Sequence, residues 1–384
     1  MKVKDVYPNG DKLWFNDFYQ IENEIFFTAG NYNSLYKYSL IKHELEWLGV
    51  FENEKKYKPQ LYGKIIKVLN KLFFIPQYAK SLGIYDLKGK KIDTIALPDE
   101  VCKSTYGPKF YNTLINKNSL FLFPGYTPYI LEYNLNNSNW IIHNEWYNAY
   151  KNKYSIKSEL LFQEDFVKKD NLCFLPASHF CGIMSYNIES NAYDLINVNF
   201  ESRNLTSLAY DNEFLWTCTS NNYLLKINFE GEILDQINLG EVYGLKCNIY
   251  QTSFFDGYLY LFFDMECKYI KISANNPKEE FEIIEYSEKR DYSNYEYLCV
   301  DFLKNTEEAV FFFPKADRRI QKINKKDSSI FCDAILADDL YANKEIDLLS
   351  YYDETAENGI IYEIASTKES INSLLRYCDI NNSV

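Results

Sequence analysis

Few residues of this chain are suited to acid–base or metal chemistry. Its 384 residues include three histidines, His43, His143 and His179, and a histidine-based zinc or iron site would have to gather all of them. We predict His43 in a turn on the opposite face of the molecule from the other two, so we expect no metal site. The sequence contains no Asp-x-Asp-x-Asp calcium loop and no P-loop, G-x-G-x-x-G, G-x-S-x-G or H-E-x-x-H motif. We therefore predict no cofactor and identify no catalytic residue.

Aromatic and polar side chains gather instead in short segments that follow apolar triplets. Tyr32, Tyr78 and Tyr126 stand in three such segments, His179 stands in a fourth, and Arg318 lies in the last one along the chain. Tyrosine joins an apolar ring to a polar tip, which suits contact with a ligand. We predict all five as ligand-binding residues. Only His179 and Arg318 suggest acid–base or anion chemistry, and the alternative for His179 is an ordinary loop histidine.

A second group of aromatic residues lies between residues 143 and 160. Trp146, Tyr147 and Tyr150 alternate there with hydrogen-bond donors. On a loop these rings could clamp a peptide or stack on a sugar, so we include them among the candidate ligand-binding residues. The alternative is that they pack over the rim of the molecule or form a short helix.

A repeat positions these residues. Seven times along the chain, an apolar triplet and the residue that ends its strand are followed nine or ten residues later by an aromatic residue or Ile and then by a small polar residue. These markers are Tyr38, Tyr85, Tyr133, Tyr186, Ile227, Ile272 and Ile323, so successive copies are 41 to 53 residues apart. Such intervals are typical of repeats that form one blade of a larger ring.

Each copy of the repeat predicts a four-stranded sheet. In the second copy we expect strands at 65–68, 72–75, 82–87 and 92–97, because proline, here Pro76, ends strand pairing and the small polar residue begins a tight turn. A single sheet of this kind has two apolar faces and cannot bury both, whereas a closed ring of sheets can. We therefore predict an all-β fold, a seven-bladed β-propeller of four-stranded antiparallel blades.

The repeat resembles the β-propeller proteins of kelch and WD40 type over roughly residues 11–337. Neither the kelch double glycine nor the WD40 Trp-Asp pair is present, so the resemblance implies architecture alone and carries over no functional residue. We predict one domain at 1–337, with blades near 11–50, 61–97, 108–142, 160–198, 205–239, 247–284 and 297–336. In a propeller the turns between second and third strands (b–c turns) and the connections between blades (d–a crossings) meet on one face, around the mouth of the central channel. Binding is expected on this loop face.

The segment from 338 to 384 departs from the repeat. Its first part is acidic, and we expect a solvated loop there, with a regulatory acidic latch as the alternative. Ser366 and Glu369 form a capping box, and Ile371, Leu374 and Cys378 follow at helical spacing. We predict a short C-terminal helix that packs on the propeller or, alternatively, on a partner.

Composition narrows the function classes. The net charge of -13 disfavours a nucleic-acid partner. Nine scattered cysteines without a Cys-x-x-Cys pair indicate thiols in a reducing compartment, and no apolar run reaches membrane-spanning length. Frequent Asn, Lys, Ile and Tyr indicate an AT-rich bacterial genome. We expect a cytoplasmic protein without a membrane partner.

Three functions fit these observations. The first is a non-catalytic scaffold that binds a peptide or protein on the loop face. The second is an enzyme or a carbohydrate-binding protein with its site at the channel mouth, with a small sugar as ligand. The third is a ring-shaped structural subunit of a larger assembly. The sequence favours the first because it contains no catalytic motif.

Overall fold

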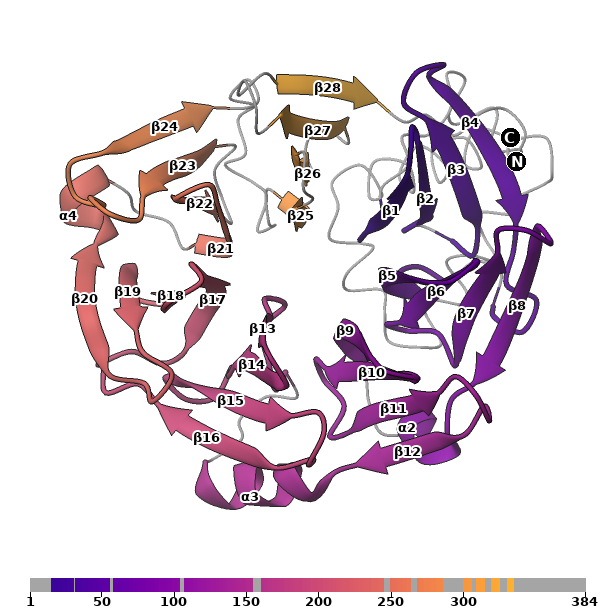
Figure 1. Cartoon of the computed structure of the whole chain (residues 1–384), viewed down its shortest axis with the longest axis horizontal. Coiled ribbons are helices and arrows are strands. Elements are labelled where there is room, and N and C mark those ends of the chain that lie inside the picture. The colour runs from indigo at the N-terminus through magenta and orange to yellow at the C-terminus, as the bar shows by residue number, and fades with distance from the viewer. Residues whose placement is uncertain are drawn as a thin grey trace, which may run out of the picture.

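The fold is a ring of seven four-stranded antiparallel sheets (Figure 1). The computed structural model describes residues 15–30, 32–55, 58–103, 107–154, 160–244, 249–263, 268–285, 300–305, 309–314, 319–324 and 330–334. The predicted seven-bladed propeller is confirmed. The acidic loop and the helix expected at 338–384 lie outside the described residues.

The elements follow the chain blade by blade. Blades 1 to 4 comprise β1 (Phe18–Ile21), β2 (Glu24–Thr28), β3 (Leu35–Ser39), β4 (Glu44–Gly49); β5 (Tyr62–Val68), β6 (Lys71–Pro76), β7 (Ser81–Asp86), β8 (Lys91–Ala96); β9 (Phe110–Asn116), β10 (Ser119–Pro124), β11 (Ile130–Asn134), β12 (Trp140–His143); and β13 (Val167–Lys169), β14 (Leu172–Pro176), β15 (Gly182–Asn187), β16 (Tyr193–Asn197). Blades 5 to 7 comprise β17 (Leu205–Tyr210), β18 (Leu215–Thr219), β19 (Tyr223–Ile227), β20 (Ile233–Asn238); β21 (Ile249–Phe255), β22 (Tyr258–Phe263), β23 (Lys268–Ser273), β24 (Phe281–Glu285); and β25 (Val300–Asn305), β26 (Ala309–Pro314), β27 (Arg319–Asn324), β28 (Ile330–Ala334). The described residues include three helices, α2 (Asp99–Lys103), α3 (Glu145–Lys153) and α4 (Leu239–Tyr243), all in crossings between blades.

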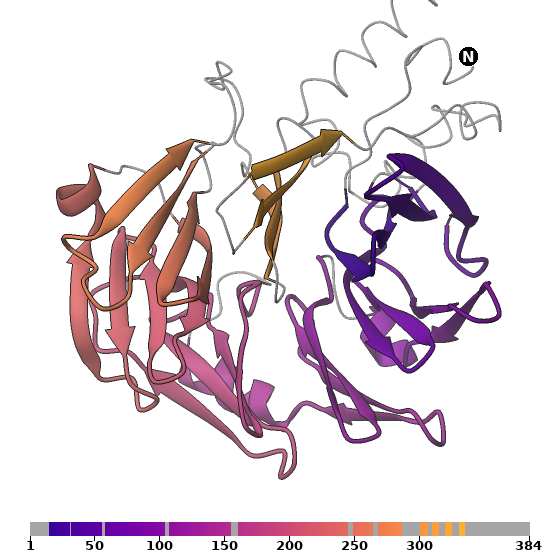
Figure 2. The same ribbon diagram turned by 45° about the horizontal axis from the view of Figure 1, so that its top comes forward.

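Within each blade the strands pair in sequence order. The first strand stands nearest the ring axis and the fourth at the perimeter, and Figure 2 shows each sheet twisting between the two. The second blade's strands match the predicted ones to within three residues at each end. The described helices include none that is both long enough and apolar enough to span a membrane.

The hydrophobic core is divided among the junctions between neighbouring blades. Strand β6 shows why: Leu72 and Phe74 pack in a cluster shared with blade 1, whereas Phe73 and Ile75 pack in a cluster shared with blade 3. Successive side chains of a strand point to opposite faces, so a strand that is apolar at every position serves two neighbours. Full burial of one such side chain stabilises the fold by roughly 1.5–3 kcal/mol, and the ring provides that burial on both faces.

The strands nearest the axis are irregular at their start. The pairing register shifts near the first residues of β5, β9, β17, β21 and β25, which marks β-bulges. In blade 4 the pairing is interrupted between the isolated bridge of Phe162 with Ala177 and the first β13 pair, Val167 with Phe174. A bulge redirects side chains and removes backbone groups from the ladder. At these places polar groups approach the ring axis.

Among the described residues, the ring is closed between blades 7 and 1 by contacts of side chains. No described strand from one end of the chain completes a sheet at the other end there. Phe18 of β1 meets Phe311 of β26 edge to face, with ring centroids 4.8 Å apart. Phe15, Phe27 and Ile320 belong to the same buried cluster. Each of the seven sheets is built from one continuous stretch of chain, so the closure depends on these contacts.

Candidate functional site

On the loop face, one continuous chain of backbone hydrogen bonds links blades 4, 3, 2 and 1. Each N–H in the series donates to the carbonyl of the next residue named, at 2.8 to 3.0 Å: Ser178 to Leu161, Leu161 to Gly125, Gly125 to Lys109, Lys109 to Gln77, and Gln77 to Leu61. Gln60 N–H then reaches the carbonyl of Gly30 in blade 1 at 2.9 Å. The bonds run alternately within a blade, from b–c turn to crossing, and between blades. They therefore fix the turns and crossings of four blades relative to one another.

Two aromatic rings on this face pack directly against glycines. A Cβ at Gly107 would lie 2.4 Å from Cδ1 of Tyr126, and one at Gly125 would lie 2.8 Å from the ring of Tyr111. The rings of Tyr111 and Tyr126 meet at right angles with centroids 6.2 Å apart. Glycine is required at both positions because the rings occupy the space of a side chain. We call Tyr111 and Tyr126 the aromatic shelf.

Next to the shelf lies a buried ammonium group. Lys109 is 6% exposed, and its Nζ donates to the carbonyls of Ala79 at 3.1 Å and Gln77 at 3.4 Å. Burial lowers the pKa of Lys109 to about 8, and repulsion from Lys58 acts in the same direction. The Lys58 ammonium stands 5.8 Å from the ring centroid of Tyr78. The loop face of blade 2 is therefore locally positive in a protein of negative net charge.

Near the ring axis, Asp17 connects blades 7, 1 and 2. One carboxylate oxygen accepts the backbone N–H of Ile65 in β5 at 2.8 Å, and the other accepts Nζ of Lys304 in β25 at 2.9 Å. Lys304 also donates to the carbonyl of Phe18. Asp17 is 4% exposed, and burial lowers the pKa of Lys304 while the Asp17 charge opposes that shift. The pair therefore joins the two ends of the ring.

Asp165 connects blades 4, 5 and 6 in the same way, but among the described residues it has no cation at ion-pair distance. Its Oδ2 atom accepts the backbone N–H of Leu208 at 2.9 Å and that of Thr252 at 3.1 Å, both beside strand bulges. Burial raises the pKa of Asp165 from 3.8 to about 7, although the two N–H groups act in the opposite direction. Its neighbour Glu164 accepts the hydroxyl of Tyr250 in β21 at 2.7 Å. Carboxylates at the start of blade 4 thus reach across to blade 6.

Three predicted residues, Tyr32, Tyr78 and Tyr126, lie on b–c turns of blades 1 to 3. Tyr32 and Tyr126 are partly exposed, and the Tyr32 hydroxyl is hydrogen-bonded to that of Tyr36 at 2.9 Å. Tyr78 is only 9% exposed, so it offers a ligand little surface. The hydrogen-bond chain brings the turns of blades 2 and 3 together at Gln77 and Gly125.

The interpretation of Trp146 and Tyr150 as a ligand clamp is wrong. The segment forms α3 on the perimeter of the ring (Figure 1), where Trp146 is 1% and Tyr150 0% exposed. Both rings pack on Phe162, and the Tyr150 hydroxyl donates to the Leu161 carbonyl at 3.1 Å. They fill the junction of blades 3 and 4, as the helix alternative predicts. Tyr147 of α3 remains partly exposed.

Of the two residues expected to suggest acid–base or anion chemistry, the structure describes only His179. The ring of His179 meets that of Tyr150 at 6.1 Å, and its backbone N–H is hydrogen-bonded to the Tyr150 hydroxyl. His179 thereby ties the b–c turn of blade 4 to α3. Arg318 lies outside the described residues.

Possible metal ligands do not converge in the part of the chain that the structure describes. There, no group of three or more His, Cys, Asp or Glu side chains could hold an ion. Cys102, Cys173, Cys181 and Cys218 are free thiols, and burial raises the pKa of Cys181 to about 11. These thiols are thus in their protonated, unreactive form at neutral pH.

Four residues near the ring axis were not predicted from the sequence: Asp17, Asp165, Tyr250 and Lys304. A usable signal exists, because each polar residue stands in or just before the first strand of a blade, the strand nearest the axis of a propeller. In strands that face only apolar neighbours, buried acids and lysines are not expected. Their recurrence in or just before first strands points to the ring centre.

The closed ring of seven sheets defines this protein as a β-propeller. No protein-family model matches the sequence, and no curated protein matches it. Among solved structures, the computationally designed Ika8 protein is similar with a TM-score of 0.55 at 10% identity, over 86% of this chain and 89% of that one. The predicted β-propeller architecture is therefore confirmed.

Two natural proteins have comparable similarity. Hsv2 of Kluyveromyces lactis, with its loop 6CD complete, has a TM-score of 0.50 at 11% identity and covers 84% of this chain and 98% of that one. U3-55K has a TM-score of 0.51 at 8% identity and covers 85% and 96%. At such identities the likeness shows the fold alone.

Proposed function

We propose that this protein is a non-catalytic cytoplasmic scaffold that binds a peptide or protein partner on its loop face. The observation that carries the proposal is the backbone hydrogen-bond chain from Ser178 in blade 4 to Gly30 in blade 1, which holds the turns and crossings of four blades in one fixed arrangement. A rigid frame with partly exposed tyrosines lowers the entropic cost of binding an extended partner. The finer assignment, a bacterial propeller of kelch-like or WD40-like architecture, belongs to this proposal.

The carboxylates near the ring axis favour a scaffold over an enzyme. Asp165 accepts two backbone N–H groups, Asp17 accepts Ile65 N–H and Lys304, and Glu164 accepts Tyr250. Acid–base catalysis needs a group within reach of substrate. Each of these groups already holds blades together, which fits a structural role.

Affinity capture with paired variants tests the proposal. Wild-type protein, the double variant Tyr32→Ala/Tyr126→Ala and the control Tyr193→Ala are immobilised and exposed to an extract of the source organism. Tyr193 lies on the perimeter strand β16 and is 37% exposed, so the control removes an equally large aromatic side chain away from the loop face. Circular dichroism confirms that each variant is folded.

We expect one protein recovered near stoichiometry by wild type and by Tyr193→Ala, and at least tenfold less of it by the double variant. A peptide scan of that partner should then locate a short binding segment. Recovery of no stoichiometric partner, or equal recovery by the loop-face variant, would contradict the proposal.

A further inference from the structure

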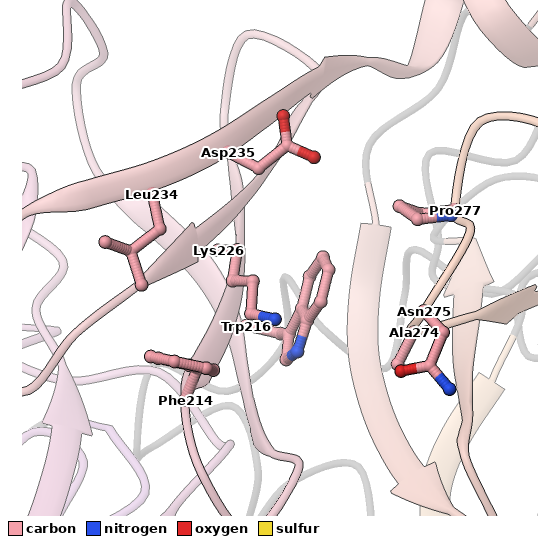
Figure 3. A pocket seen from close by; sticks show the side chains of 8 residues that line it. All are labelled: Phe214, Trp216, Lys226, Leu234, Asp235, Ala274, Asn275 and Pro277. Carbon is pink, nitrogen blue, oxygen red and sulfur yellow. The ribbon is translucent and has the colours of Figure 1, made fainter.

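A separate cavity lies at the perimeter between blades 5 and 6 (Figure 3). Its volume is about 370 Å³, which is within the usual range of small-ligand sites. Blade 5 contributes Phe214, Trp216, Lys226, Leu234 and Asp235, and the turn between β23 and β24 of blade 6 contributes Ala274, Asn275 and Pro277. None of these residues belongs to the loop-face turns.

Strand register explains why the blade 5 side chains meet. Trp216 of β18 is paired with Lys226 of β19, and Lys226 is paired with Asp235 of β20. Paired residues on adjacent antiparallel strands project to the same face of a sheet. The three side chains therefore form one row that faces blade 6. Phe214, just before β18, extends the row, with the Lys226 ammonium 4.3 Å from its ring centroid.

Two polar groups of the cavity keep hydrogen-bonding capacity, and Lys226 can still donate. The Lys226 ammonium forms a long ion pair with Asp211 at 4.0 Å and lies over the rings of Phe214 and Trp216, 4.3 and 5.2 Å from their centroids. It donates no hydrogen bond to any acceptor among the described residues. Asp211 already accepts the Trp216 indole at 2.7 Å and two backbone N–H groups. Asp235 uses one oxygen, Oδ1, to accept Gln236 N–H at 2.8 Å and Lys278 at 3.3 Å. Its Oδ2, like the Asn275 amide, has no hydrogen-bond partner in the same part of the chain.

The groups that line the cavity match one class of ligand. Lys226 can only donate hydrogen bonds, Asp235 can only accept them, and the Asn275 amide does both. Lys226 and Lys278 balance Asp211 and Asp235 in charge, so no ion is favoured. Phe214, Leu234 and Pro277 supply apolar walls. Sugars combine hydroxyls that donate and accept with C–H faces that pack on such walls.

We propose that the cavity between blades 5 and 6 binds a neutral sugar. Asp235 and Asn275 hold its hydroxyls, Lys226 donates to a ring or hydroxyl oxygen, and the sugar ring packs between Phe214 and Leu234 of blade 5 and Pro277 of blade 6. This site is independent of the partner proposed for the loop face. The double variant Tyr32→Ala/Tyr126→Ala should therefore keep it.

Saturation-transfer NMR and calorimetry with defined sugars test the site. The probes are glucose, galactose, mannose and N-acetylglucosamine, with maltose, cellobiose and diacetylchitobiose. Full-length wild-type protein is compared with Asp235→Ala and Asn275→Ala. The matched control is Asp194→Ala in β16, because Asp194 accepts the N–H of the following residue, Leu195, as Asp235 accepts that of Gln236.

We expect at least one probe to bind wild type and Asp194→Ala with equal affinity, and at least fivefold more weakly to Asp235→Ala and Asn275→Ala. The proposal is overturned if no probe binds wild type, or if binding is unchanged in both cavity variants. Orthophosphate serves as the charged competitor. If orthophosphate binds in place of the sugars, and more tightly to Asp235→Ala, the cavity is an anion site and the proposal is equally overturned.

Discussion

At the scale of single residues, two aspartates near the ring axis share one position and differ in their electrostatic surroundings. Asp17 and Asp165 both precede the first strand of a blade, and both accept backbone N–H groups of following blades. Asp17 has an ammonium partner, Lys304, at 2.9 Å. Asp165 has two N–H groups and no cation at ion-pair distance among the described residues. Its charge is therefore the more expensive one to bury.

Asp165 should make the protein less stable as pH rises towards neutrality. Burial raises its folded pKa to about 7 from 3.8, so between pH 4 and pH 7 the folded chain keeps a proton that the unfolded chain has released. Stability from this group is thus complete below pH 4 and is lost as pH rises through 7, by up to about 4 kcal/mol. Asp165→Asn should remove this loss and be the more stable protein at pH 8. Urea unfolding at half-unit intervals from pH 4 to pH 8 measures the difference.

Comparison with the variant isolates Asp165 from other titrating groups. Burial also raises the pKa of Glu54, but Glu54 is present in both proteins and cancels in the difference. A wild-type profile parallel to that of Asp165→Asn across the whole range would show that Asp165 titrates normally in the fold. Such a result would contradict the predicted pH dependence of stability, but it would not contradict the two hydrogen bonds that Asp165 accepts.

At the scale of elements, the aromatic shelf depends on glycine at the end of β10. Gly125→Ala places a Cβ 2.8 Å from the Tyr111 ring and 3.0 Å from the Pro108 carbonyl, so the ring or the crossing must move. We expect a loss of about 1–3 kcal/mol, typical of overpacking. Chemical denaturation measures it. Gly89→Ala is the control, because its Cβ would lie 3.4 Å from Asp86, an ordinary contact, and a cost as large there would show that the effect is not specific to the shelf.

A variant in the helix α3 tests whether Trp146 stabilises the fold or binds a ligand. Trp146→Ala removes a side chain that is 1% exposed and packs on Phe162 and Tyr150, so we expect a loss of roughly 3–5 kcal/mol. Differential scanning calorimetry should show the lower melting temperature. Partner binding measured well below that temperature should be unchanged. A folded variant with wild-type stability and reduced binding would restore the ligand-clamp interpretation of this residue.

Strands were predictable here, and the sites were predictable only in part. Apolar triplets ended by proline or a small residue, as at Pro76 and Pro124, locate second strands because pairing stops where no N–H is available. Tyr126 was correctly placed on a turn because turn composition is a local property. Whether Trp146 lies on a loop or on a buried helix depends on its packing against Phe162 and Tyr150. These are tertiary contacts, which local sequence does not define. The cavity of Trp216, Lys226 and Asp235 depends on the register of three strands, which alternation of residue types alone does not define.

At the scale of the whole molecule, stability is distributed over seven junctions that must all be present. Each buried cluster contains residues of two neighbouring blades, from Phe18 and Phe311 at the closure to Trp216 and Leu261 between blades 5 and 6. An open ring would leave two apolar faces in water. We therefore expect the propeller to unfold cooperatively, with the closure as its most sensitive junction.

The Asp17–Lys304 pair should be coupled strongly across that closure. Asp17→Asn leaves the Lys304 ammonium without its carboxylate, and Lys304→Met leaves Asp17 with only the Ile65 N–H, so each single change should cost about 3 kcal/mol. The double variant Asp17→Asn/Lys304→Met should cost clearly less than the two together, because no unpaired charge remains. Urea unfolding of the four proteins gives the coupling energy.

The exposed pair of Lys117 and Glu189 is the natural comparison for this cycle. Its side chains are 74% and 43% exposed, and Lys117→Met should change stability by less than about 0.5 kcal/mol because solvent screens the pair. If the Asp17 and Lys304 variants are as mild as this control, or if their effects simply add, the ion pair does not hold the ring closed. Packing of Phe15, Phe18 and Phe311 would then have to carry the closure, and Phe311→Ala should by itself separate blade 7 from blade 1.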